Sequence, residues 1–105
     1  MSFFTRMEAV MQQFLCIHTI PAGSISRHQL EKFAETAQHD PDVRGYRSFM
    51  SPSKGKVVCI MEAPDEAVVA SWFHKMGLPV DSITRLEFEG DRGIVREAGM
   101  MHAGV

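Results

Sequence analysis

The chain has 105 residues and a mass of 11.8 kDa, which corresponds to one domain and excludes repeat arrays and multidomain enzymes. Hydrophobic residues make up 45% and charged residues 23%, as in an ordinary globular protein with a sizeable core. The formal net charge of −2 argues against a nucleic-acid partner, which would require a basic surface. No apolar stretch approaches the ~20 residues of a membrane helix, and the N-terminus lacks a secretory signal pattern, so we expect a cytoplasmic protein with no membrane partner.

The first two predicted elements are a strand and a helix. Strand-forming residues fill 14–20 and end at Pro21. The helix begins after Ser26, which makes a capping box with Gln29, and its apolar stripe recurs at helical spacing. The stripe consists of Leu30, Phe33, Ala34 and Ala37.

Four more elements follow. Strands over 43–50 and 56–62 flank a turn-forming segment, which predicts an antiparallel pair. Pro64 suits the first turn of a second helix that ends at Gly77, and a fourth strand covers 80–88. The residues beyond show no sustained periodicity.

This order predicts an α+β fold, a ferredoxin-like βαββαβ sandwich with a four-stranded antiparallel sheet and two helices on one face. The first and third strands should be neighbours. We expect a single domain over 1–105 with its core at 14–88, an extension at 1–13 that includes a possible short helix at 3–11, and a C-terminal tail at 89–105.

Side-chain alternation groups several metal-ligating residues on one sheet face. Cys16 and His18 share a face of the first strand, and Cys59 and Met61 share a face of the third. If the aliphatic residues on the other parity pack under the helices, these donors lie together on the uncovered face. Two cysteines are too few for a disulfide framework and should be free thiols. Thiolate, imidazole and thioether suit nickel, copper or zinc.

Two segments carry a resemblance to a known family. The segment Cys59-Ile-Met-Glu62-Ala-Pro64 and the segment Gly77-Leu-Pro-Val-Asp81-Ser-Ile83 resemble the Cys-x-x-Glu-Ala-Pro and Gly-x-Pro-x-Asp-x-Ile signature of a family of small bacterial proteins described as nickel-binding and ferredoxin-like. The match covers about residues 14–88.

The resemblance implies a ferredoxin-like fold, a homodimer and bound nickel or another divalent transition metal. His18 stands at a position similar to one where family members carry Glu or His, and Cys59 and Glu62 match the signature directly. Cys16 lies outside the recognised pattern, so its candidacy rests on strand alternation alone. The candidate metal ligands are therefore His18, Cys59, Cys16 and Glu62.

Other interpretations stay open. Buried cysteine and methionine also fill dimer interfaces without any metal, which would make the chain a non-catalytic interaction module. A dimeric α+β barrel would enclose a small-molecule pocket between two sheets, as in enzymes of the monooxygenase or isomerase type. Glu62 and Asp65 are more typical of helix capping than of acid/base catalysis. His74 is expected at the surface, and the methionines and histidine at 100–102 are attributed to chance.

Overall fold

The computed structural model describes residues 11–99. In chain order the elements are β1 (Gln12–Thr19), α2 (Arg27–Gln38), β2 (Arg44–Ser51), the short 3-10 helix η1 (Pro52–Lys54), β3 (Lys56–Ala63), α3 (Glu66–Met76), β4 (Ser82–Arg85), β5 (Phe88–Asp91) and β6 (Ile94–Glu97). The first four strands form an antiparallel sheet in the order β2-β3-β1-β4. The predicted ferredoxin-like topology, with β1 beside β3, is confirmed.

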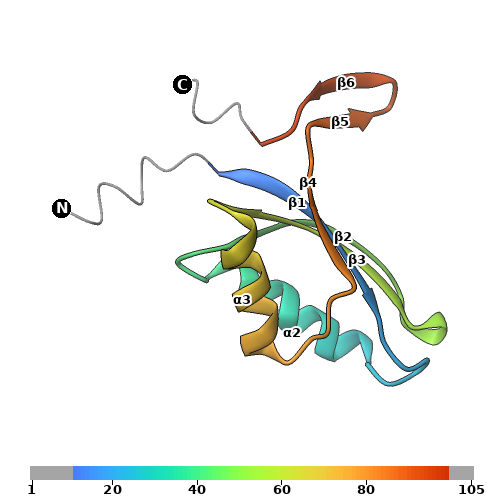
Figure 1. Cartoon of the computed structure of the whole chain (residues 1–105). Helices are drawn as coiled ribbons and strands as arrows, with labels where there is room; N and C mark the ends of the chain where they lie inside the picture. The colour runs from blue at the N-terminus through green and yellow to red at the C-terminus, as the bar shows by residue number, and fades with distance from the viewer. Residues whose placement is uncertain (1–10, 100–105) are drawn as a thin grey trace.

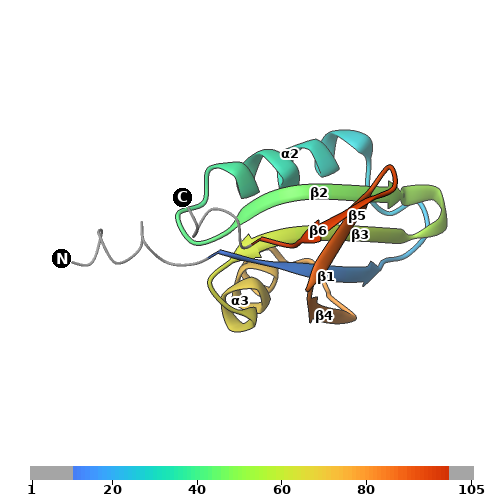
Figure 2. The same cartoon turned by 90° about the horizontal axis from the view of Figure 1, so that it is seen from above.

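The molecule has a helical layer on one side of the four-stranded sheet. Both α2 and α3 lie on that side, and the β5–β6 hairpin lies on the other (Figure 1). Seen from above, the hairpin crosses over the central strands (Figure 2). The sheet thus has a helix face, which α2 and α3 cover, and an open face, which carries the side chains of Leu15, Ile17, Val58 and Ile60.

The start of α2 has the predicted capping box. The Ser26 hydroxyl accepts a hydrogen bond from the backbone N–H of Gln29 at 3.1 Å, and the Gln29 side chain accepts one from the Ser26 N–H at 2.8 Å. Two helix N–H groups that would otherwise lack partners are satisfied in this way. Ile25, just before the cap, is half-buried against the core.

The ends of α3 are set by Asp65 and Gly77. The Asp65 carboxylate accepts from the Val68 N–H at 3.0 Å, so Asp65 is the N-cap and Pro64 precedes the helix instead of lying in its first turn. Gly77 adopts a left-handed φ of 74°, which ends the helix as predicted. Asp65 is therefore a capping residue, in agreement with the sequence prediction.

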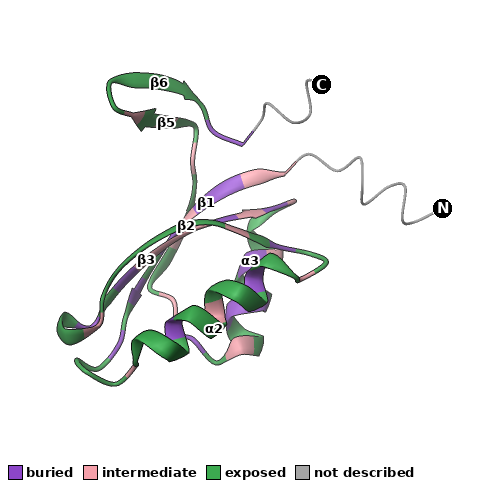
Figure 3. Cartoon of the chain, turned by 180° about the vertical axis from the view of Figure 1, so that it is seen from behind, coloured by how far each residue is buried: buried purple, intermediate pink, exposed green. Residues whose placement is uncertain are grey.

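The core lies between the helices and the helix face. Phe14, Val57 and Met61 project from the central strands and are buried against Val69 and Phe73 of α3. Figure 3 shows buried residues along β1, β3 and α3, whereas the β5–β6 hairpin is exposed. Among residues 11–99, no helix is long and apolar enough to cross a bilayer.

The C-terminal part of the described chain differs from the prediction. The fourth strand ends at Arg85, and the chain then forms the hairpin of β5 and β6, where no regular structure was expected. Its turn is built by Arg92 and Gly93, with φ of 51° and 87°, a pair of left-handed residues that matches the twist of a tight hairpin. Residues 3–10 of the possible N-terminal helix and the segment 100–102 lie outside the described residues.

Candidate functional site

As strand alternation predicts, three of the predicted donors share one face of the sheet, but it is the helix face and not the open face. Cys16, His18 and Cys59 share the helix face, where Cys16 and His18 are both 0% exposed. The prediction that they lie on the uncovered face is wrong. Both faces of the central strands are apolar, so alternation alone cannot decide which one the helices cover. The aromatic side chains of α3 pack against the cysteine and histidine face.

His18 is enclosed by α3 and the chain that follows it. Its ring contacts the Phe73 ring edge-on, with centroids 4.5 Å apart. Nδ1 lies 2.7 Å from the carbonyl oxygen of Pro79, which only accepts hydrogen bonds, so Nδ1 carries the proton and donates. Nε2 is buried and has no hydrogen-bond partner among the described residues. Burial lowers the pKa of His18, against the opposing effects of the Pro79 hydrogen bond and the Asp81 charge, so the ring is held neutral.

The second signature segment builds the surroundings of His18. Pro79 supplies the carbonyl that fixes the ring, and the N–H of Asp81 donates to the carbonyl of Ile17 at 2.7 Å. The Asp81 carboxylate accepts from the Thr19 hydroxyl at 2.6 Å. The segment after Gly77 is therefore hydrogen-bonded to β1 on both sides of His18, at Ile17 and at Thr19. The sequence did not indicate this role, because a backbone carbonyl partner has no residue signature.

The two cysteines are direct neighbours across the central strands. Cys16 pairs in register with Cys59, and both are free thiols. Burial, followed by the charges that Cys59 and Glu66 carry when ionised, raises the pKa of Cys16 to about 12, and its thiol donates to the Phe14 carbonyl at 3.6 Å. Burial also raises the pKa of Cys59, which a hydrogen bond from Ser48 partly offsets. Both sulfurs are therefore protonated at neutral pH, and a metal ion that binds them must displace the proton.

Glu62 lies apart from these donors. It alternates with Met61 and so points to the open face, where Gln13 Nε2 donates to its carboxylate at 3.1 Å. Glu62 and His18 therefore cannot bind the same ion within one chain. His74 is exposed on α3, as expected.

The donors do not form a ready three-ligand site. Within residues 11–99, no group of three His, Cys, Asp or Glu side chains is placed to hold one metal ion. The structure does bring together a neutral imidazole with an unpartnered nitrogen and, on the same face, two neighbouring thiols. Imidazole and thiolate donors suit nickel chemically, although each thiol must first lose its proton.

A comparison with protein-family models shows which family the chain belongs to. Residues 14–86 match the family model described as nickel responsive protein SCO4226-like. The chain belongs to the SCO4226-like family. Both signature segments, and with them His18, Cys59 and Pro79, lie inside the matched region, which confirms the predicted resemblance. Neither a search of curated proteins nor a search of solved structures gave a match.

Proposed function

We propose that this SCO4226-like protein is a homodimer that binds nickel, or another divalent transition metal, through His18 with Cys16 and Cys59 as further donors. Membership in a nickel-responsive family supports the choice of metal. The proposal contains no catalytic step.

The state of His18 is the observation that carries the metal part of this proposal. Metal-ligating histidines almost always donate the other ring N–H to a carbonyl or carboxylate, which fixes the tautomer and directs the free nitrogen to the metal. His18 has this arrangement, with Nδ1 hydrogen-bonded to Pro79 at 2.7 Å and Nε2 buried without a partner in the part of the chain that the structure describes. A buried acceptor without a partner lowers the stability of the fold. We therefore infer that this nitrogen is present to bind a ligand and not to stabilise the protein.

A thermal unfolding experiment tests this assignment. Nickel at about 100 times its Kd would stabilise the folded state by about 2.7 kcal/mol, which raises Tm by roughly 10–20 °C for a chain of this length. The protein should be purified without a polyhistidine tag and stripped of metal. We expect His18→Ala to remove the shift and His74→Ala, on the exposed side of α3, to retain it. A His18→Ala variant with the full shift would exclude His18 as a ligand.

The open face supports the dimer. The central strands place Leu15, Ile17, Val58 and Ile60 there, and Ile17 is 38% exposed while neighbouring Phe49 of β2 is 58% exposed. Contiguous apolar surface of this kind is typical of a protein interface. Packing of two such sheets against each other would give a dimeric α+β barrel.

The hairpin extends the same surface. Phe88, Ile94 and Val95 are 61%, 64% and 70% exposed. The hairpin is held above the open face because the Tyr46 hydroxyl of β2 donates to the Glu89 carboxylate at 2.6 Å. We infer that the sheet of a partner subunit packs between the open face and this anchored hairpin, whose apolar side chains are exposed.

Light scattering tests the dimer. We expect twice the monomer mass for the native protein and the monomer mass for Ile17→Lys, which places a charge in the middle of the proposed interface. Ala70→Lys, at an exposed position of α3 on the opposite side of the molecule, is the matched control and should stay dimeric. A monomeric native protein would contradict this part of the proposal.

A further inference from the structure

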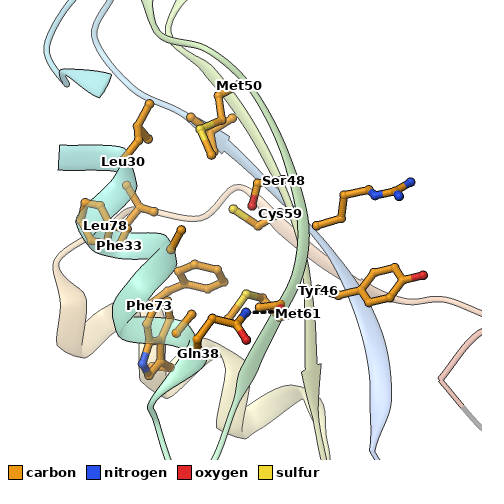
Figure 4. A pocket seen from close by; sticks show the side chains of 16 residues that line it. Leu30, Phe33, Gln38, Tyr46, Ser48, Met50, Cys59, Met61, Phe73 and Leu78 are labelled. Atoms are coloured by element: carbon orange, nitrogen blue, oxygen red, sulfur yellow. Dashed lines mark hydrogen bonds between the residues drawn. The ribbon is translucent and has the colours of Figure 1, made fainter. Parts of the chain in front are cut away.

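An apolar cavity lies between α2 and the helix face of the sheet. Its volume is about 170 Å³. In Figure 4, Leu30 and Phe33 of α2 form one wall, and Met50 and Cys59 extend toward them from the sheet. The space opens to solvent between α2 and β2, since Ala34, Ser48 and Met50 of its lining are exposed.

Beside Leu30 and Phe33, the stripe of α2 has only the small side chains of Ala34 and Ala37, which leave part of the space between helix and sheet open. Of its apolar stripe only Leu30 and Ala37 are buried, Phe33 is half-buried, and Ala34 lines the cavity while remaining exposed at its mouth. Ala34 lines this space, so we expect a larger side chain there to occupy part of it. The C-terminal end of α2 packs closely on β2, where a Cβ at Gly45 would lie 3.4 Å from the Ala37 Cβ, and this contact bounds the opening on that side.

The walls favour an aromatic guest. Phe33, Trp72 and Phe73 supply aromatic rings, and Met50 and Met61 supply thioethers. Ring edges and methionine sulfurs both make favourable contacts with aromatic molecules.

The lining offers neutral polar groups and no charge directed at a guest. Arg47 is the only charged residue of the described lining, and it pairs in register with Ile60, so its side chain belongs to the open face. Ser48 and Cys59, which pair in register on β2 and β3, point from the sheet toward α2 (Figure 4). The Ser48 hydroxyl can pair with one hydroxyl or N–H of a guest, whereas no charged side chain of the described lining faces the space to pair with a carboxylate.

We propose that this cavity is a binding site for a small uncharged aromatic molecule of the size of phenol, with its ring between α2 and the sheet and its polar group at Ser48. An apolar protein cavity of about 150 Å³ can bind benzene, so the volume is sufficient. This site goes beyond the proposed metal and dimer function: it does not lie between two sheets and it requires no metal, although it shares Cys59 with the proposed metal donors.

Titration of the metal-free protein with phenol tests the proposal. The chain has a single tryptophan, and because Trp72 lines the cavity its fluorescence reports on occupancy. We expect a saturable fluorescence change and a rise in Tm with phenol, and neither with benzoate, which carries the same ring with a charge. Equal responses to phenol and benzoate, or no saturable response to phenol, would overturn the proposal.

Two variants separate binding in the cavity from binding elsewhere. Ala34→Leu fills part of the cavity and should weaken phenol binding at least tenfold, while Ala70→Leu, exposed on α3 and outside the lining, should leave it unchanged. Ser48→Ala should weaken phenol binding but not benzene binding. Unaltered phenol binding by Ala34→Leu, with circular dichroism showing the native fold, would place the phenol elsewhere. All titrations contain a chelator, so failure of the nickel proposal would not affect their outcome.

Discussion

Replacement of His18 by phenylalanine should make the metal-free protein more stable. Phenylalanine keeps an aromatic ring against Phe73, one ring atom larger than imidazole, and removes a buried nitrogen that has no partner among residues 11–99. A buried unsatisfied polar group costs about 1–3 kcal/mol, and the lost hydrogen bond to Pro79 is worth about 0.5–1.5 kcal/mol. Pro79 is exposed, so its carbonyl can be hydrated in the variant. The net expectation at about pH 8 is a gain of about 1 kcal/mol.

The difference should grow as the pH falls. Burial holds the pKa of His18 below its ordinary value of 6.5, so between the two values the unfolded chain binds a proton that the folded chain does not. The stability contributed by the neutral ring is fully present above pH 6.5 and decreases as the pH falls toward the folded-state pKa. One such group changes the free energy of unfolding by at most about 1.4 kcal/mol per pH unit.

Urea unfolding at a series of pH values, with a chelator present, measures both effects. The quantity compared is the free energy of unfolding of His18→Phe minus that of the native protein, because other titrating groups cancel in this difference. A matched His28→Phe substitution on the exposed side of α2 is the control. A His18→Phe variant that is several kcal/mol less stable at pH 8, or a difference independent of pH, would refute the assignment of His18 as a buried neutral ring.

Further predictions concern the turns and the thiols. Gly55→Ala should destabilise the protein by about 3 kcal/mol in urea unfolding, since its φ is 71° and the new Cβ would lie 2.1 Å from a backbone oxygen. Gly23→Ala, with φ of 74° and no described atom within 4 Å of the new Cβ, should cost only about 1 kcal/mol. Equal costs for the two variants would contradict the clash at Gly55. Thiol labelling followed by mass spectrometry should modify half-buried Cys59 before fully buried Cys16; the reverse order would contradict the assigned burial. Gly93→Val, at φ of 87°, should disrupt the hairpin turn and weaken the dimer in sedimentation experiments; unchanged association would show that the arm takes no part.

Local signals predicted the elements and their order well. The capping box of Ser26 and Gln29, the stop at Gly77 and the turn before β3 are interactions among nearby residues, so the sequence displays them directly. Right-handed crossovers then place β1 beside β3 without further information.

The covered face and the hairpin could not be predicted in the same way. Alternation groups Cys16 with His18, but Leu15 and Ile17 are equally apolar, so the side chosen depends on how α3 packs across the sheet. The short strands β5 and β6 are mostly exposed and lack an alternating pattern, and a non-glycine residue, Arg92, occupies half of their turn. Such tertiary preferences have no short-range signature.

The sequence correctly grouped the two thiols with His18 on one face of the sheet but placed that face away from the helices, which is wrong, and metal binding by these donors stays a prediction. Strand alternation put the two thiols and His18 together and would also have separated Glu62 from them, since Cys59 and Glu62 are three residues apart along one strand. The Pro79 carbonyl that fixes the ring was not foreseen.

Calorimetric titration of untagged, metal-free protein with nickel tests the central proposal most directly. We predict saturable heat and a defined stoichiometry for the native chain and for His74→Ala, and loss of that heat for His18→Ala. Undiminished nickel binding by His18→Ala, or no binding by the native chain, would contradict the assignment of the buried imidazole to a metal.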